Sequence, residues 1–254
     1  MTALFTSESV SAGHPDKLCD AISDAIVDAC LNIDSSARVA VETLVKGMSH
    51  KAVIILAGEV SLDGDAPDYE AIARATAARI GYTNHAIGMD ATSSDATSSD
   101  LCDVQVNVTT QAANIAQGVD GNSLDDVGAG DQGMMFGYAC TETETGGQLH
   151  GRYFPLPAAL AQRICRRLDM IVASGEIDWI RTDGKSQVTV EYDDAGNPLR
   201  VHTVVVAVQH DDALKDHFGG DVEAEQAHIR EGIKSEIVEH AIPAHWIGGG
   251  YILH

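Results

Sequence analysis

The chain has 254 residues, of which 44% are hydrophobic and 21% charged, values typical of a globular protein with one or two domains. Its 38 acidic residues outnumber 16 basic residues and give a net charge of -22, which argues against nucleic acid as a partner because phosphates would be repelled. The first residues lack a signal-peptide pattern, and no apolar run reaches the roughly 20 residues of a membrane span. We therefore expect a cytoplasmic protein with no membrane partner.

The first strong pattern is an amphipathic helix that begins at Pro15. Leu18, Ile22, Ile26 and Cys30 recur every four residues. Proline suits the first helical position, since its missing N–H has no partner there. This places residue 14 at the helix N-terminus, where backbone N–H groups attract anions.

Two strands and a second helix are predicted next, over residues 38–45, 52–60 and 67–80. Glu42 and Glu59 lie within these apolar strands. A buried carboxylate needs a cation or another partner, so an inward Glu42 would suit a metal or an ammonium group. The alternative is that both carboxylates face solvent at a sheet edge.

The middle of the chain is rich in turn signals. Residues 90–100 contain a direct repeat of Asp-Ala-Thr-Ser-Ser, which indicates a surface loop lengthened by duplication. A strand is predicted over 104–110 and another over 134–139, the second opened by the glycine-rich segment 128–133.

The last hundred residues repeat the earlier pattern. A helix is predicted over 156–174 and closed by Gly175, a hairpin joins strands 186–192 and 201–209, and a helix follows over 222–240. The sequence thus predicts an α+β fold in which strand-strand-helix units form mixed sheets covered on one side by helices, rather than a doubly wound parallel sheet.

Two short segments combine residue types that bind phosphates. Residues 13–17 place His14, Asp16 and Lys17 in one helical turn, and Asp183-Gly184-Lys185 precedes a strand. Imidazole and ammonium groups bind phosphate oxygens, and a carboxylate binds a hard cation or ribose hydroxyls. Spacing alone also allows a capped surface helix and a polar turn. No nucleophile paired with a base and no metal-binding histidine pair stands out.

Longer segments identify a resemblance. Residues 5–17 (FTSESVSAGHPDK) and 128–138 (GAGDQGMMFGY) closely resemble the signature segments of bacterial-type S-adenosylmethionine synthetases. Further segments that resemble the family in the same order are residues 40–43, 58–59, 115–119, 183–188 and 243–246. The resemblance covers essentially the whole chain.

The resemblance implies an enzyme that makes S-adenosylmethionine from ATP and L-methionine. The methionine sulfur attacks C5′ of ATP, and the displaced triphosphate is cleaved to pyrophosphate and phosphate. It implies Mg²⁺ and K⁺ as cofactors and a homo-oligomer, a dimer or a dimer of dimers, with the site between two subunits.

The resemblance also assigns residues. His14 and Lys185 would be catalytic and would bind ATP together with Asp183 and Gly184. Asp16 would bind Mg²⁺ and Glu42 would bind K⁺. The methionine-binding residues would be Glu59, Gln111 and Asp131.

The chain departs from the family pattern in three places. Residues 111–115 read Gln-Ala-Ala-Asn-Ile where the family has Gln-Ser-Pro-Asp-Ile, the duplication at 90–100 is extra, and the chain ends before a segment rich in phosphate-binding cations. We therefore expect a pseudo-threefold architecture that lacks its third domain. An alternative is a catalytically inactive fragment or regulatory subunit that assembles with a complete partner.

The resemblance finally predicts how the chain divides. Residues 1–12 and 142–254 would form the N-terminal domain and the start of a return strand. Residues 13–114 would form an incomplete central domain, and residues 115–141 would join the absent C-terminal domain.

Overall fold

The computed structural model describes residues 2–96, 98, 100–110, 134, 136–144 and 147–254. The chain divides into two compact units. One, which we call the split unit, combines Met1–Lys17 with Tyr138–His254, and the other, the inserted unit, is Leu18–Gly137. Each unit has its own sheet and its own hydrophobic core.

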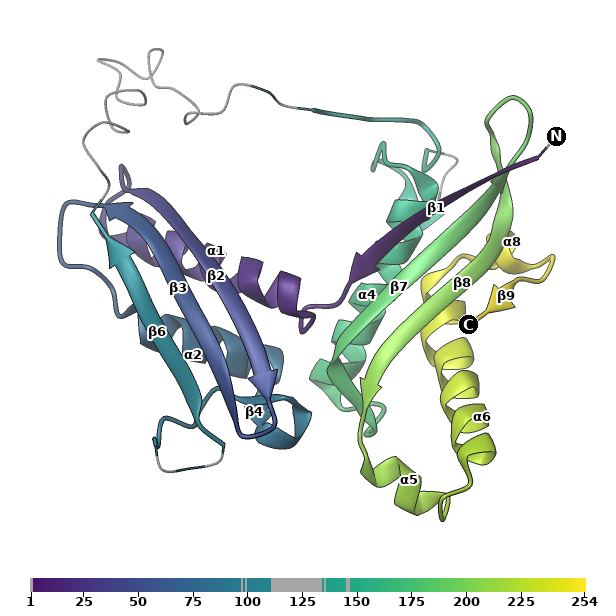
Figure 1. Ribbon diagram of the computed structural model, residues 1–254. Coiled ribbons are helices and arrows are strands. Elements are labelled where there is room, and N and C mark those ends of the chain that lie inside the picture. The colour runs from purple at the N-terminus through teal and green to yellow at the C-terminus, as the bar shows by residue number, and fades with distance from the viewer. Residues whose placement is uncertain (1, 97, 99, 111–133, 135, 145–146) are drawn as a thin grey trace. The chain divides into compact units, whose positions relative to one another are not determined.

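The inserted unit is a mixed sheet covered on one face by helices (Figure 1). Its strands, in the order β2-β3-β6, are β2 (Arg38–Met48), β3 (Lys51–Ser61) and β6 (Cys102–Thr109). The first two form an antiparallel hairpin, whereas β6 runs parallel to β3. The parallel pairing follows because the helix α2 (Tyr69–Ile80) carries the chain back across the sheet before β6 begins.

Helix periodicity accounts for the inserted core. Helix α1 (Pro15–Ile33) buries the predicted stripe of Leu18, Ile22, Ile26 and Cys30 against the sheet. Helix α2 is capped by Asp68, whose carboxylate accepts the Ala71 N–H at 2.9 Å. These contacts confirm the predicted helices and the two predicted strands that lie between them.

A short pair of strands, β4 (Thr83–Asn84) and β5 (Met89–Asp90), flanks a 3-10 turn at His85–Ile87 and leads into the duplicated loop. The described residues of this loop form turns. Arg74 of α2 holds it, because its guanidinium donates to the carbonyl oxygens of Ala91, Ser93 and Cys102 at 2.9–3.1 Å. The prediction of a loop at 90–100 is therefore correct.

The split unit repeats the same plan with one strand more. Its sheet has the order β1-β7-β8-β9, formed by β1 (Ala3–Val10), β7 (Ile180–Tyr192), β8 (Pro198–His210) and β9 (Ile252–Leu253). Strand β7 is antiparallel to both β1 and β8, and β9 joins β8 in parallel. A hairpin, a helix and a parallel strand thus recur in both units.

Helices cover one face of this sheet and close its core (Figure 1). Helix α4 (Leu156–Ser174) buries the predicted stripe of Leu160, Ile164, Leu168 and Ile171 and ends at Gly175, whose φ of 67° is left-handed. The remaining helical segments are η2 (Gly147–Leu149), α5 (Ala213–His217), α6 (Val222–Gly232), the π-helical Ile233–Val238, α7 (Glu239–Ala241) and α8 (Ala244–Ile247).

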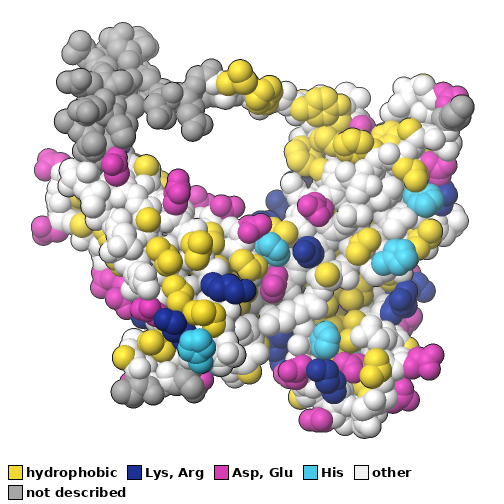
Figure 2. Space-filling view, in the orientation of Figure 1, with side chains coloured by type: hydrophobic (Ala, Val, Ile, Leu, Met, Phe, Trp, Pro, Cys, Tyr) yellow, Lys and Arg dark blue, Asp and Glu magenta, His cyan; other side chains and the backbone are white. Residues whose placement is uncertain are grey.

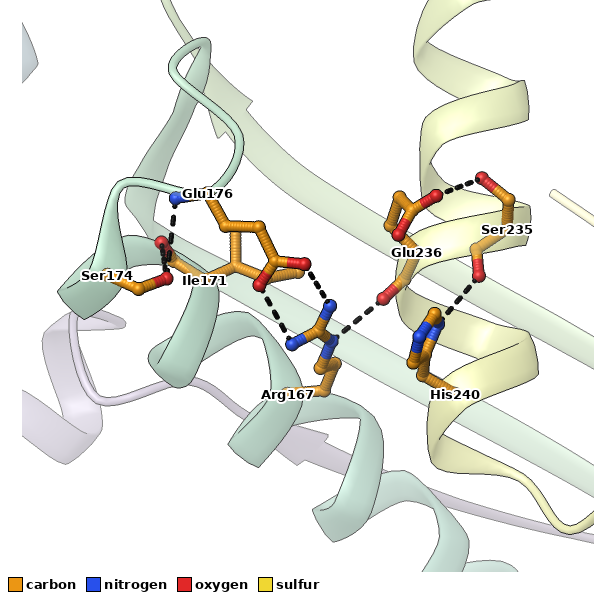
Figure 3. Close-up of polar contacts among 7 residues, drawn as sticks. All are labelled: Arg167, Ile171, Ser174, Glu176, Ser235, Glu236 and His240. Atoms are coloured by element: carbon orange, nitrogen blue, oxygen red, sulfur yellow. Dashed lines mark hydrogen bonds and ion pairs between the residues drawn. The ribbon is translucent and has the colours of Figure 1, made fainter.

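Arg167 joins α4 to the π-helical segment (Figure 3). Its Nε donates to the Glu236 carbonyl oxygen at 2.8 Å, and its two terminal nitrogens bind the Glu176 carboxylate at 2.7 and 3.0 Å. A planar guanidinium can satisfy all three acceptors at once. The two helical elements are therefore tied together by the Arg167 side chain, which also binds the segment that follows α4.

Two strand predictions need correction. The described residues of 134–139 are not in a strand, and Met134, Phe136 and Tyr138 are 77%, 91% and 76% exposed. A strand requires a paired neighbour, and among the described residues none pairs with this segment. Conversely, β1 was not predicted, although it pairs with β7 over its whole length.

The surface reflects the acidic composition. Figure 2 shows Asp and Glu side chains spread over the visible face, with fewer Lys and Arg side chains between them. None of the described helices has both the length and the apolar character needed to cross a bilayer.

Candidate active site

The turn that precedes α1 is held against β7 in the split unit. The Ser11 N–H donates to the Gly184 carbonyl oxygen at 2.8 Å, and the buried Ser11 hydroxyl donates to the Thr182 carbonyl oxygen at 2.8 Å. Two hydrogen bonds from one residue fix the entry to the helix relative to the strand. The motif at residues 13–17 and the motif at residues 183–185 are thereby brought together.

Gly13 is required for this close approach. A Cβ atom at this position would lie 2.5 Å from the Thr182 carbonyl oxygen and 2.2 Å from its hydroxyl oxygen. Real carbon and oxygen atoms do not approach so closely without a shift of the backbone. The close packing against Thr182 therefore explains why residue 13 is a glycine.

His14 is oriented by the helix that it caps. Its Nδ1 accepts the Asp16 N–H at 3.3 Å, and its side chain is only 19% exposed. When Nδ1 accepts, the neutral ring carries its proton on Nε2. That proton is then available to an oxygen atom outside the helix.

Asp183 and Lys185 alternate along β7 and so share one face of the strand. Burial raises the pKa of Asp183, while the neighbouring His14 and Lys185 act in the opposite direction. The Ser11 hydrogen bonds to Thr182 and Gly184 hold the turn that carries His14 against the strand that carries Asp183 and Lys185. The four residues predicted to bind ATP, His14, Asp183, Gly184 and Lys185, therefore form one cluster in the split unit.

Asp169 is hydrogen-bonded to the same turn, and sequence reasoning missed it. Its Oδ1 accepts the Ala12 N–H at 2.8 Å, which anchors the turn to α4. Burial raises the pKa of Asp169, and the Ala12 hydrogen bond and the charge of Lys17 lower it. No sequence motif indicates this role, because the contact of Asp169 is with a residue 157 positions away. Nothing in the sequence distinguishes Asp169 from the other acidic residues, of which the chain has 38 in all.

Glu42 and Glu59 lie in the inserted unit and share one face of its sheet. In the register of β2 and β3, Glu42 is opposite Ala57 and Glu59 is opposite Ala40, whereas the core residues Val41 and Leu56 face the helices. Glu42 is exposed on an edge strand, so the interpretation of an inward Glu42 is wrong. Glu59 is half-buried on the central strand.

Gln111 and Asp131, the other two residues assigned to methionine, lie outside the described residues. The same holds for most of the signature segment 128–138. The described residues therefore include all those predicted to bind phosphate and ribose, and Glu59 alone of those predicted to bind methionine.

The described residues contain no group of three or more histidine, cysteine, aspartate or glutamate side chains that could hold a metal ion. The Asp16 side chain is 86% exposed at the N-terminus of α1, beside His14. Mg²⁺ commonly takes one or two carboxylates and completes its shell with substrate phosphates and water. Asp16 fits that role, and Glu42 offers a single exposed carboxylate to a cation.

Comparison with known proteins agrees with this geometry. Residues 2–113 match the family model "S-adenosylmethionine synthetase, N-terminal domain", and residues 126–252 match "S-adenosylmethionine synthetase, central domain". The chain is 44% identical over 244 residues to a protein named S-adenosylmethionine synthase from Maridesulfovibrio salexigens. That alignment covers 96% of the chain and 54% of the relative, so the chain spans about half the length of the relative. The chain belongs to the S-adenosylmethionine synthetase family.

Proposed function

We propose that the protein acts in the synthesis of S-adenosylmethionine from ATP and L-methionine. The observation that carries this proposal is the cluster of His14, Asp183 and Lys185, in which the turn that carries a ring donor is hydrogen-bonded to the strand that carries a half-buried carboxylate and an ammonium group. Such a cluster suits a nucleotide, because phosphates bind the donors and the ribose hydroxyls bind the carboxylate. Family membership supports the same assignment.

The first chemical step needs no protein nucleophile. The sulfur of methionine attacks C5′ of ATP, the C5′–O bond breaks, and the electron pair leaves with the triphosphate. The protein's task is to orient both substrates and to stabilise the charge that gathers on the leaving oxygen. His14 would donate from Nε2 to a phosphate oxygen, Lys185 would neutralise the polyphosphate, and Asp183 would accept from the ribose.

The cation sites belong to the proposal as well. Asp16 would hold Mg²⁺, which when bound supplies positive charge to the phosphate oxygens. Glu42 would help to bind K⁺, and Glu59, Gln111 and Asp131 would bind methionine. We also propose that the protein works as a homo-oligomer in the cytoplasm.

The direct test is an activity assay. The purified chain is incubated with ATP, methionine, Mg²⁺ and K⁺, and S-adenosylmethionine and released phosphate are measured. Product from the chain alone would support the whole proposal. A folded sample that yields no product would contradict catalysis by this chain and would leave a protein that binds substrate or a complete partner.

Nucleotide binding is tested separately, so that the site assignment does not depend on turnover. Lys185→Gln and Asp183→Asn should each weaken ATP binding about tenfold or more, the loss expected for a charge-assisted contact. Lys234→Gln is the matched control, because Lys234 is a half-exposed lysine in the same unit, far along the chain from both motifs. Equal ATP affinity in the wild type and Lys185→Gln would overturn the role of Lys185.

A further inference from the structure

Three arginines gather around one hollow of the split unit, apart from the cluster described above. Arg163 and Arg166 lie on α4, and Arg152 lies in the segment that leads into it. Together with Leu149, Phe154 and Gln162 they line a cavity of about 250 Å³. This concentration is unusual in a chain with only 16 basic residues against 38 acidic ones.

Among the described residues the cavity has no counter-charge. None of the acidic side chains that the structure describes lines it, and neither Arg152 nor Arg166 forms an ion pair or a side-chain hydrogen bond with a described residue. Both side chains are exposed. Several other arginines are paired, as Arg167 is with Glu176 and Arg181 is with Asp211.

Two of the three positions are fixed by neighbouring contacts, and the third, Arg166, is carried by α4. Arg163 donates from Nε to the Ala241 carbonyl oxygen at 2.7 Å and from Nη2 to the side chain of Gln148. The Glu144 carboxylate accepts the N–H groups of Gly151 and Tyr153 at 2.8 Å, on either side of Arg152. The backbone that carries Arg152 is therefore anchored, and Glu144 has its ion pair with His150 at 3.4 Å.

We propose that this hollow, lined by Arg152, Arg163 and Arg166, is a binding site for a small multivalent phosphate anion such as pyrophosphate. Guanidinium groups are preferred ligands for phosphate because they present paired N–H donors in a plane. Three of them from two segments surround one space, so they suit a tetrahedral group that exposes oxygens in several directions. A planar carboxylate offers two oxygens and is satisfied by one guanidinium.

The electrostatics of the hollow agree with this geometry. Burial lowers the pKa of Arg163, and the positive charges of Arg152 and Arg166 lower it further. Like charges at close range repel one another and are stabilised by a bound anion. The proposal concerns a site separate from His14 and Lys185, and it does not depend on the proposed reaction.

Isothermal titration of the full chain with pyrophosphate, at low ionic strength and without added metal, tests the proposal. Arg152→Gln/Arg166→Gln should weaken binding about tenfold or more, as expected when charge-assisted hydrogen bonds are lost. Arg152→Lys/Arg166→Lys should lose part of the affinity, because the charge remains while the paired donors do not. Added salt should weaken binding in the wild type.

Two controls separate this site from others. Arg79→Gln removes one exposed arginine from the inserted unit and should leave the affinity unchanged. Lys185→Gln removes a cation of the proposed ATP site and should leave one pyrophosphate site intact. The proposal fails if pyrophosphate does not bind, if the double glutamine variant binds with wild-type affinity, or if a tricarboxylate such as citrate binds equally well.

Discussion

Gly13 lies so close to Thr182 that even a methyl group has no room. Gly13→Ala would place a Cβ 2.5 Å from a backbone oxygen, and we expect it to destabilise the split unit by about 1–3 kcal/mol, the usual range for overpacking. Because the turn must shift, ATP binding should fall as well. Urea unfolding and nucleotide titration of the variant measure the two effects.

The control for this substitution is Gly249→Ala. No atom lies within 4 Å of a Cβ built on Gly249, so this change should alter the unfolding free energy little. Equal stability of the two variants would show that the turn relaxes without loss.

We expect Asp169 to make the stability of the split unit fall as the pH rises. Burial raises its pKa, so the folded state holds the proton more tightly than the unfolded chain. The tighter proton binding adds to the free energy of unfolding below the ordinary aspartate pKa of about 3.9. This contribution is lost as the pH rises through the raised pKa of the folded state. Asp169→Asn cannot lose a proton, and its amide oxygen can still accept the Ala12 N–H.

The measurement is urea unfolding of both proteins between about pH 3.5 and about pH 6.5. The unfolding free energy of Asp169→Asn, relative to the wild type, should increase with pH across this window. A constant difference would contradict the prediction, and a decreasing one would show that Lys17 and the Ala12 hydrogen bond outweigh burial.

Sequence analysis could propose candidate site residues that lie in short motifs, and it missed residues whose contacts are distant in the sequence. His14, Asp183 and Lys185 lie in short motifs whose residue types already indicate phosphate and ribose binding. Ser11 and Asp169 act through hydrogen bonds with backbone atoms that are distant in the sequence. Such contacts depend on the fold and leave no periodic or local signal.

Arg167 gives a prediction at the scale of elements. Arg167→Ala leaves the Glu236 carbonyl oxygen without its donor and should destabilise the protein by about 1–3 kcal/mol. Arg167→Lys should recover only a small part of this loss, because one ammonium cannot bind both Glu176 and the carbonyl in the geometry of Figure 3.

Glu176→Gln separates the two contacts of Arg167. The Glu176 side chain is 44% exposed, so solvent screens its ion pair and the loss should be smaller than that of Arg167→Ala. Thermal or urea unfolding of the three variants measures the order of their stability losses. An equal loss in Glu176→Gln and Arg167→Ala would assign the stabilisation to the surface ion pair.

Periodicity predicted most elements, because a stripe every three or four residues reports burial on one side of a helix. Periodicity did not predict elements whose side chains are only weakly buried. Strand β1 has several exposed residues, so it lacks the alternation of a half-buried strand. Residues 134–139 are apolar enough to suggest a strand, yet backbone pairing decides whether one forms, and the sequence contains no direct signal of it.

The acidic balance of the whole molecule predicts a response to salt. With a net charge of -22, like charges repel across the surface seen in Figure 2, and salt screens this repulsion. We expect the melting temperature to rise as KCl is raised from about 0.1 M to about 2 M. Differential scanning calorimetry at fixed pH measures it, and a flat or falling melting temperature would contradict the expectation.

The division of the split unit also sets an order of events during synthesis. The side chain of Ser11 binds the backbone of Thr182, 171 positions later, whereas the inserted unit is continuous in sequence. At translation rates of about 5–20 residues per second, β1 waits roughly 10–30 seconds for β7 to leave the ribosome. The inserted unit can fold during this interval, while the turn of the candidate site forms only after most of the chain has been made.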